Sequence, residues 1–256
     1  MTARAKISEL EEISSNGWPA REVDHIGGWR LRANDGVTRR ANSVLPLADP
    51  KRNLDDAIDA VEQFYEHRVI VPRFQMTEAS APRNLDSQLV ERGYVTDITV
   101  RVQTTTIRNL TAIGARHSVE MNPGITAEWL STYATAGQFD EKAIKGRADI
   151  LERINAKRAF ALARVSDNMV GVGVGVLEHG WLGLFAIETL EAYRRAGVAT
   201  SVIYSLGVWG KENGARAAYL QVEAKNMPAL ALYEKMGFND MYHYWSRTKT
   251  DARKTG

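Results

Sequence analysis

The sequence predicts an α/β fold built on a mixed sheet, and three successive patterns predict it. Residues 159–189 contain three apolar runs separated by turn residues, which is typical of antiparallel strands joined by hairpins. Residues 200–213 then change to helical spacing, and residues 217–224 return to a strand pattern. A strand, a helix and a strand in succession form a parallel crossover unit. The predicted sheet therefore begins as an antiparallel meander and ends in a parallel pair.

The remaining elements of the second half follow from helical spacing and from turn residues. Asn122-Pro123-Gly124 closes a first strand, Asn213-Gly214 ends the long helix, and Gly237 ends a short one. In order, the second half is predicted to contain a strand at 116–121, helices at 125–137 and 148–157, the three strands of the meander, a helix at 200–213, a strand at 217–224, a helix at 226–236 and a strand at 241–247.

The first half repeats this order more weakly. An amphipathic helix ending near Asn16-Gly17 comes first. Residues 73–98 then resemble residues 218–241, with Gln75 beside Gln221, Glu91 beside Glu234 and Gly93 beside Gly237 when small gaps are allowed. We interpret this as an internal duplication whose boundary lies near residues 105–117. The predicted domains are residues 1–112 and 113–256, and the repeated segments of the first are 27–34, 37–47, 54–67, 73–79, 85–94 and 98–107.

Composition limits the possible functions. The chain has 256 residues, 44% of them hydrophobic, with 33 basic and 31 acidic side chains and a net charge of +2. This balance gives no broad field for nucleic acid or an anionic membrane, so neither is expected as a partner. There is no cysteine, which excludes disulfides and thiolate chemistry. No apolar stretch approaches the roughly 18 residues that span a bilayer, and none resembles a signal peptide, so we expect a cytoplasmic location.

The segment RRAGVA at residues 194–199 lies between a predicted strand and a predicted helix. The first amides of a helix have no intrahelical partner, and the helix dipole is positive at this end, so such a loop can bind phosphate. Small residues at Ala196, Gly197 and Ala199 would let an anion approach the backbone, and Arg194 and Arg195 could add charge. An ordinary strand-to-helix turn is the alternative for these six residues.

Two motifs together resemble the GNAT N-acetyltransferase superfamily. Arg194-x-x-Gly197-x-Ala199 is similar to its Arg/Gln-x-x-Gly-x-Gly/Ala signature, with Ala199 where glycine is commoner. The second signature is matched over residues 219–238, and the resemblance spans residues 181–245 in the expected element order. It implies two GNAT-like domains in tandem, the second one catalytic. The positions matched in the second signature are Asn226, Ala229, Leu232, Tyr233, Gly237 and Phe238.

The resemblance also implies a cosubstrate and a set of contacts. The cosubstrate would be acetyl-coenzyme A, used without a metal, and the acceptor would be a primary amine of a small molecule or a peptide. Backbone at Ile187 and Thr189 would pair with the pantetheine arm, Asn226 would contact the same arm, and Tyr233 would lie near the thioester sulfur. The pyrophosphate would be held by Arg194 and by the amides of Arg195, Ala196, Gly197, Val198, Ala199 and Thr200.

An amine that is protonated at pH 7 needs a proton acceptor, and Tyr233 could donate to the departing thiolate. Glu223 is the first candidate base and Glu188 the second, with Glu178 and His179 further away. Each could equally be a surface or turn residue, and Tyr233 could simply pack on the core. An acyl-coenzyme A sensor without turnover is the rival hypothesis, and a nucleic-acid-binding protein with steeply salt-dependent affinity is a third. Monomer and homodimer both remain open.

The first half lacks the phosphate-loop pattern. Residues 46–56 occupy the corresponding place but bring Asp49, Asp55 and Asp56 to a helix start, where they would repel phosphate. We therefore expect a degenerate GNAT-like domain that binds no cofactor. A polar group in its predicted hairpin could line a substrate cleft or could face outward: Trp29, Arg30, Arg32, Arg39, Arg40 and Asn42.

Two further patterns predict neither a metal site nor a dinucleotide-binding site. The five histidines, at positions 25, 67, 117, 179 and 243, show no metal-ligand spacing. Residues 171–178, GVGVGVLE, have glycines at every second position and open no helix, so they are not a dinucleotide motif. They predict a strand whose small face lets another surface approach closely.

Overall fold

The computed structural model describes residues 2–250, which form two compact units. One unit contains residues 2–100 together with 242–250, and the other contains residues 101–241. This division differs from the predicted domains, 1–112 and 113–256, because residues 242–250 belong to the first unit. Strands β5 (Tyr94–Thr106) and β11 (Asn239–Lys249) each contribute residues to both units.

The second unit carries the predicted meander and crossover. Its strand order is β6-β7-β8-β9-β10-β5, antiparallel as far as β9 and parallel between β9 and β10. The mixed sheet predicted from the sequence is therefore confirmed. The elements are α4 (Ile107–Leu110), β6 (Ser118–Asn122), α5 (Ala127–Gly137), α6 (Glu141–Glu152), β7 (Lys157–Val165), β8 (Asn168–Glu178), β9 (Trp181–Thr189), a 3₁₀ turn (Glu191–Tyr193), α7 (Val198–Glu212), β10 (Ala217–Glu223) and α8 (Met227–Lys235).

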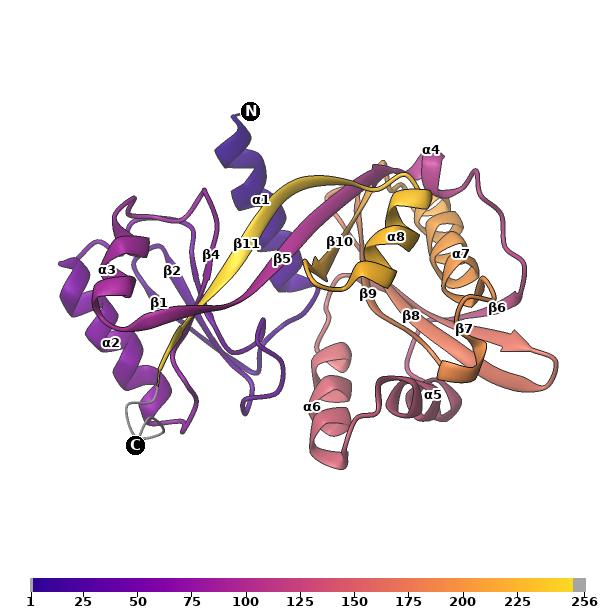
Figure 1. The fold of residues 1–256 in the computed structure, drawn as a ribbon, viewed down its shortest axis with the longest axis horizontal. Coiled ribbons are helices and arrows are strands. Elements are labelled where there is room, and N and C mark those ends of the chain that lie inside the picture. Colours follow the sequence, from indigo (N-terminus) through magenta and orange to yellow (C-terminus); the bar gives the residue numbers. More distant parts are fainter. Residues whose placement is uncertain (1, 251–256) are drawn as a thin grey trace. The chain divides into compact units, whose positions relative to one another are not determined.

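Helices cover both faces of these strands (Figure 1). On one face α7 lies against the alternating glycines of β8, where a Cβ on Gly173 would come within 2.6 Å of Val202 Cγ1. On the other face Trp129 of α5 packs edge-on against Phe160 of β7, with ring centres 5.3 Å apart. The close approach predicted for the glycine face of this strand is confirmed, and it seats α7 directly on the sheet.

The first unit has the same plan on a smaller scale. Strands β1, β2 and β3 are antiparallel neighbours, and β3 pairs in parallel with β4 after the helix α2. Figure 1 shows α2 and α3 on one side of these strands and α1 on the other. The sequence pattern missed β1, which is short and mostly exposed. The elements are α1 (Ala3–Asn16), β1 (Glu22–Ile26), β2 (Trp29–Ala33), β3 (Val44–Pro46), α2 (Leu54–Glu66), β4 (Arg73–Met76) and α3 (Leu85–Glu91).

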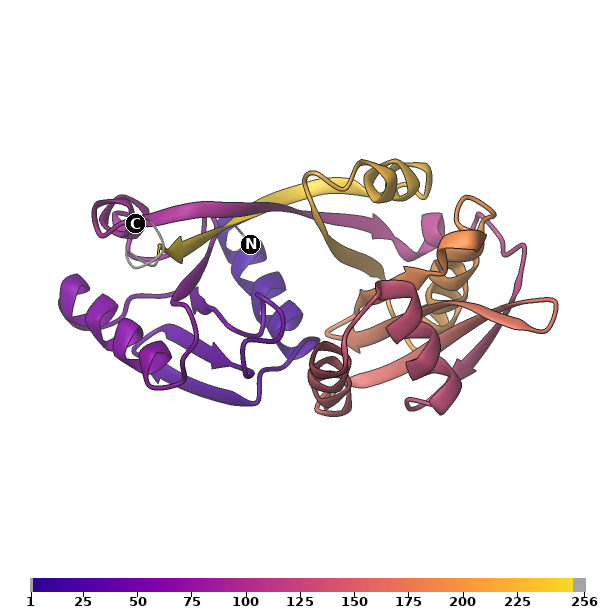
Figure 2. The same cartoon turned by 60° about the horizontal axis from the view of Figure 1, so that its bottom comes forward.

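Each unit takes its last strand from the other half of the sequence. In the first unit β4 pairs with β11, with Trp245 opposite Met76, and in the second unit β10 is the neighbour of β5. Figure 2 shows β5 and β11 as two long strands. The turns that lead into them are equivalent, since Gly93 and Gly237 have φ of +81° and +78°. The two halves thus share the order strand, helix, strand, helix, strand.

A buried polar network holds β11 in the first unit. The hydroxyl of Tyr242 donates to Glu11 Oε1 at 2.6 Å, and the amide of Gln75 donates to Glu11 Oε2 at 2.5 Å. Arg32 donates to Gln75 Oε1 at 3.0 Å and to the hydroxyl of Ser43 at 2.8 Å. Burial raises the pKa of Glu11 and lowers the pKa of Arg32 to about 10. The carboxylate and the guanidinium are therefore joined through an amide rather than by direct contact.

The six residues of the predicted hairpin were expected either to line a substrate cleft or to face outward. Most of them instead stabilise the fold. Trp29, Arg32 and Asn42 are buried, so neither expectation describes them. Asn42 accepts from the amides of Asn34 and Gly36 and closes the β2–β3 turn. The others make local contacts: Arg30 donates to Ser15, Arg39 pairs with Asp97, and Arg40 lies over the Trp18 ring.

We expect Tyr242→Phe to lower the free energy of unfolding by about 1–3 kcal/mol, because a buried carboxyl group loses a donor. Equilibrium urea unfolding measures this loss. Tyr204→Phe on α7 is the matched control, since the Tyr204 hydroxyl bonds to none of the described residues, and it should cost less than about 0.5 kcal/mol. Equal losses in the two variants would contradict a stabilising role for the network.

Candidate functional site

Strands β9 and β10 separate part of the way along their length. Their parallel pairing runs from Trp181 and Ala217 to Leu184 and Leu220, and within the described residues it goes no further. The cause is a bulge in β9, where the register against β8 shifts and Ala186 adopts a φ of +51°. From residues 185 and 221 onward, β9 and β10 are not paired with each other, as far as residues 189 and 223.

The predicted positions Ile187 and Thr189 lie in this diverging part of β9. The side chain of Ile187 packs toward the glycine face of β8, so only its backbone is left to pair with a ligand. The carbonyl of Thr189 accepts from Arg194 Nε at 3.4 Å, and the Thr189 hydroxyl is buried without a partner among the described residues. This hydrogen bond holds Arg194 against β9, and the two terminal nitrogens of Arg194 have no partner among the described residues.

Helix α7 begins without a side-chain cap. Its N-terminal cap is Gly197, with a φ of +88°, and Arg195 two residues earlier has a φ of +61°. No described side chain accepts from the amides of residues 198–200, although every other α-helix of this unit has a capping side chain at its start. Those caps are Thr106, Thr126, Asp140 and Asn226.

The uncapped amides remain accessible to a ligand. Ala199 and Thr200 are half-buried, whereas Val198 packs its side chain into the core and offers only its backbone. Arg195 and Ala196 are exposed on the loop before them. Successive amides in this conformation, at the positive end of a helix dipole, form an anion-binding concavity.

The structure adds three residues to the loop that the sequence pattern did not indicate. The hydroxyl of Ser201 accepts from the amides of Arg116 and His117 at 3.0 and 3.2 Å, and donates to the carbonyl of Gly197 at 3.1 Å. His117 Nε2 lies 2.8 Å from the carbonyl oxygen of Ala196. Arg116 Cδ would lie 3.3 Å from a Cβ placed on Gly197, and its guanidinium has no partner among the described residues. Nothing in the spacing connects residues so far apart in sequence.

The Glu188 carboxylate lies close enough to Tyr233 to influence the ionisation of its hydroxyl. Burial, with the nearby Glu188 carboxylate, raises the pKa of Tyr233 to about 12. Burial also raises the pKa of Glu188, and the cations of Arg147 and Arg194 partly oppose this shift. Tyr233 keeps its proton at neutral pH, while Glu188 gains affinity for one.

The other candidate bases lie in less suitable places. Glu223 is the last residue of β10 and is exposed to solvent. Glu178 and His179 form the β8–β9 turn at the opposite end of β9 from Glu188. Asn226 is exposed and caps α8, with its Oδ1 accepting from the amide of Ala229 at 3.2 Å. Of the two candidates, Glu188 is half-buried and influences Tyr233, whereas Glu223 is exposed.

The equivalent helix start in the first unit is closed. Asn53 caps α2 and accepts from the amides of Asp55 and Asp56 at 2.9 and 3.5 Å. The two aspartates add negative charge in the first turn. Strand β3 pairs with β4 at one position only, Val44 with Phe74. The start of α2 is therefore capped by a side chain, unlike the start of α7.

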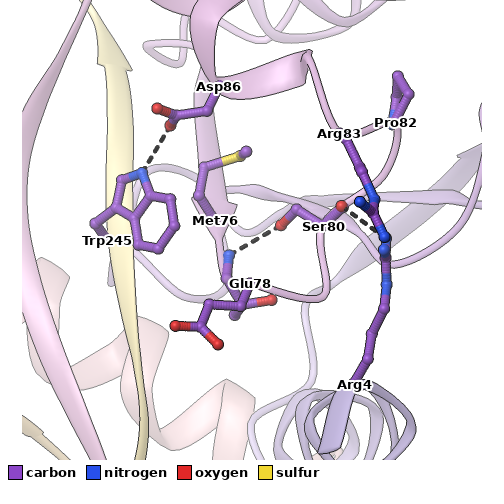
Figure 3. A pocket seen from close by; sticks show the side chains of 9 residues that line it. Arg4, Met76, Glu78, Ser80, Pro82, Arg83, Asp86 and Trp245 are labelled. Carbon is purple, nitrogen blue, oxygen red and sulfur yellow. Dashed lines mark hydrogen bonds between the residues drawn. The ribbon is translucent and has the colours of Figure 1, made fainter.

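A cavity of about 470 Å³ lies in the first unit, away from the predicted residues. Figure 3 shows Asp86 and Trp245 at one side of it and Arg4 and Arg83 at the other. Arg4 is held by the carbonyls of Ala79 and Ser80 at 3.0 and 2.9 Å. The hydrogen bond from Arg247 lowers the pKa of Asp86. Two charged groups that line the cavity, Arg4 and Asp86, are thus already hydrogen-bonded within the first unit.

Two further features concern the described part of the chain as a whole. Among residues 2–250, no group of three or more histidine, aspartate or glutamate side chains is placed to hold a metal ion. None of the helices in the same range has the length and apolarity needed to cross a bilayer.

Comparison with known proteins gives the family. A family model described as "Probable histone acetyltransferase Rv0428c C-terminal" matches residues 4–247. The chain is 31% identical over 246 residues to the "Uncharacterized N-acetyltransferase YobR" of Bacillus subtilis (strain 168), covering 95% of this chain and 98% of that protein.

Solved structures share the fold at lower identity. The GCN5-related N-acetyltransferase from Kribbella flavida matches with a TM-score of 0.73 and 15% identity, over 96% of both chains. A tandem GNAT protein from the clavulanic acid biosynthesis pathway matches with a TM-score of 0.59 and 11% identity, over 95% of this chain and 88% of the other. The chain therefore belongs to the family of the Rv0428c C-terminal region and is an acyltransferase of the GNAT N-acetyltransferase superfamily.

Proposed function

We propose that the second unit binds acetyl-coenzyme A between β9 and β10 and transfers its acetyl group to a primary amine of a small molecule or peptide. The observation that carries this proposal is the coincidence of two sets of unpartnered backbone groups, on the diverging strands and at the start of α7. An extended amide-containing arm attached to a diphosphate matches both sets, since it pairs like a strand and ends in an anion.

The cosubstrate contacts follow from these positions. Backbone at Ile187 and Thr189 would hold the pantetheine arm, and Asn226 would reach it from the start of α8. The amides of residues 195–200 would hold the pyrophosphate, with charge from Arg194 and Arg195. Arg116 is the addition that the structure suggests, because its Cδ would lie 3.3 Å from a Cβ placed on Gly197 and its guanidinium has no partner among the described residues.

The chemistry requires a proton to leave the amine nitrogen and a hydrogen bond to stabilise the departing sulfur. The amine nitrogen bonds to the thioester carbonyl carbon, the C–S bond breaks, and a proton leaves the nitrogen. Glu188 would accept that proton, directly or through water, because burial raises the pKa of its carboxyl group. Tyr233 would donate a hydrogen bond to the departing sulfur, since its proton is retained up to a pKa of about 12. Proximity of the two substrates supplies much of the remaining acceleration.

The first half would be a degenerate GNAT-like domain without cosubstrate. Support comes from the Asn53 cap and from the two aspartates at the start of α2, which leave no open amides for a diphosphate. The shared element order and the equivalent glycines Gly93 and Gly237 support an origin by duplication.

The phosphate loop can be tested with two glycines in the same conformation. Gly197→Ala and Gly214→Ala both place a side chain at positive φ, +88° and +93°, so each should cost about 1 kcal/mol of stability. Gly197→Ala would also approach Arg116 and crowd the loop, whereas nothing lies within 4 Å of a Cβ on Gly214. We expect isothermal calorimetry to show at least about tenfold weaker acetyl-coenzyme A binding for Gly197→Ala alone. Equal affinities in both variants would count against the loop.

The base can be identified from pH profiles of kcat/KM. The reactive form needs a deprotonated amine and a deprotonated Glu188, so log kcat/KM should rise with a slope of two below the raised pKa of Glu188 and a slope of one above it. Glu188→Gln should keep a slope of one throughout and lose about 10²–10⁴-fold in rate. Glu223→Gln is the control and should retain both slopes. A profile with two slopes in Glu188→Gln would rule out this base.

Turnover separates the enzyme from a sensor. Tyr233→Phe should lower kcat about 10²-fold while changing acetyl-coenzyme A affinity little, because a transition-state donor is lost without loss of the binding site. Thiol release measured across a panel of amines reports kcat. Acetyl-coenzyme A binding by the unmodified protein, with no thiol release for any amine, would instead support the sensor.

A further inference from the structure

Arg147 of α6 is a fixed cation near the proposed base. Its guanidinium carbon lies 4.0 Å from the centre of the Phe139 ring, and Nη1 donates to the hydroxyl of Tyr133 at 3.3 Å. Phe139 and Tyr133 contact each other edge-on, with ring centres 5.0 Å apart, and Tyr133 is buried. Stacking on one ring and a hydrogen bond to a second fix the plane of the guanidinium group.

The backbone before Arg147 is built around this aromatic support. Gly137 ends α5, and a Cβ there would collide with the ring of Phe139. Gln138 follows in the left-handed region, with a φ of +52°. A glycine and a strained residue together turn the chain so that Phe139 lies under Arg147.

Most of the hydrogen-bonding capacity of Arg147 is unused. Only Nη1 has a partner among the described residues, and Nε is buried without one. No described carboxylate lies within ion-pair distance of the guanidinium group. The donors left for an anionic ligand are Nη2 and the second N–H of Nη1, which have no partner among the described residues.

Glu188 is the acidic group that this cation influences. Arg147 and Arg194 both act on its ionisation, yet the side chain of Glu188 forms no ion pair or hydrogen bond with any described residue. The two groups therefore interact electrostatically, with no ion pair or hydrogen bond between them. A molecule that carries both charges would satisfy both of them.

Resting on the proposed function, we infer that the acceptor is a small amino acid, with Glu188 receiving its amine and Arg147 binding its carboxylate. The planar guanidinium fork suits a carboxylate, which it can bind through two parallel hydrogen bonds. Diamines and other polycations are disfavoured, because Arg147 and Arg194 would repel their second charge.

The test compares three acceptor types at saturating acetyl-coenzyme A: a panel of free amino acids, their amides, and 1,4-diaminobutane. The unmodified protein should prefer an amino acid over its amide by at least about tenfold in kcat/KM. Arg147→Gln should raise KM for amino acids about 10–100-fold and KM for the amides much less, so that the preference disappears. Any change in the ionisation of Glu188 would affect both acceptor types alike. Arg147→Lys should restore part of it. Lys145→Gln, an exposed change on the same helix, should retain it fully.

The outcomes separate this inference from the proposed function. A merely structural Arg147 would lower the rates for acids and amides equally, and that result overturns the inference. Turnover of diamines or peptides in preference to amino acids overturns it as well, while leaving the acetyltransferase site intact. Failure of the proposed function would look different, since acetyl-coenzyme A would not bind and no acceptor of any kind would release thiol.

Discussion

The second unit is organised around backbone groups that have no partner among residues 2–250. Buried amides and carbonyls in proteins are almost always paired, so a sheet that stops pairing needs another partner for its edges. Here the bulge at Ala186 turns β9 away from β10, and α7 starts nearby at an uncapped glycine. The glycine face of β8 seats α7 on the sheet and so fixes where these amides lie. The proposed site and its chemistry depend on this local failure of pairing.

The first unit has the same crossover, but a side chain caps the first amides of its helix. Both units contain a parallel crossover, but the helix of the first is capped by Asn53 and made acidic by its next residues. One side chain and two charges therefore distinguish the start of α2 from the start of α7, where we propose that the diphosphate binds. The exchange of last strands shows that the two halves are not independent folding units in sequence, since β4 is completed by β11.

Much of the fold could be predicted because local patterns determine it. Alternating apolar residues gave the meander, and Gly197 marked the loop, since few residues adopt its backbone conformation. What could not be predicted depends on contacts distant in sequence. Strand exchange leaves no local pattern, because residues 242–249 have a strand signature whichever neighbour they pair with. Arg116 joins the loop through Ser201, and Glu188 is distinguished from Glu223 only by burial. Trp29 and Arg32 were expected at a surface because they are polar or amphipathic, and a buried network overrides that expectation.

Hydrogen–deuterium exchange with and without acetyl-coenzyme A tests the central claim most directly, because it reports on the unpartnered amides themselves. Acetyl-coenzyme A should slow exchange in peptides covering residues 185–200 and leave peptides covering residues 46–56 of the first half unchanged. Unaltered exchange at 185–200, or equal protection of both segments, would contradict it.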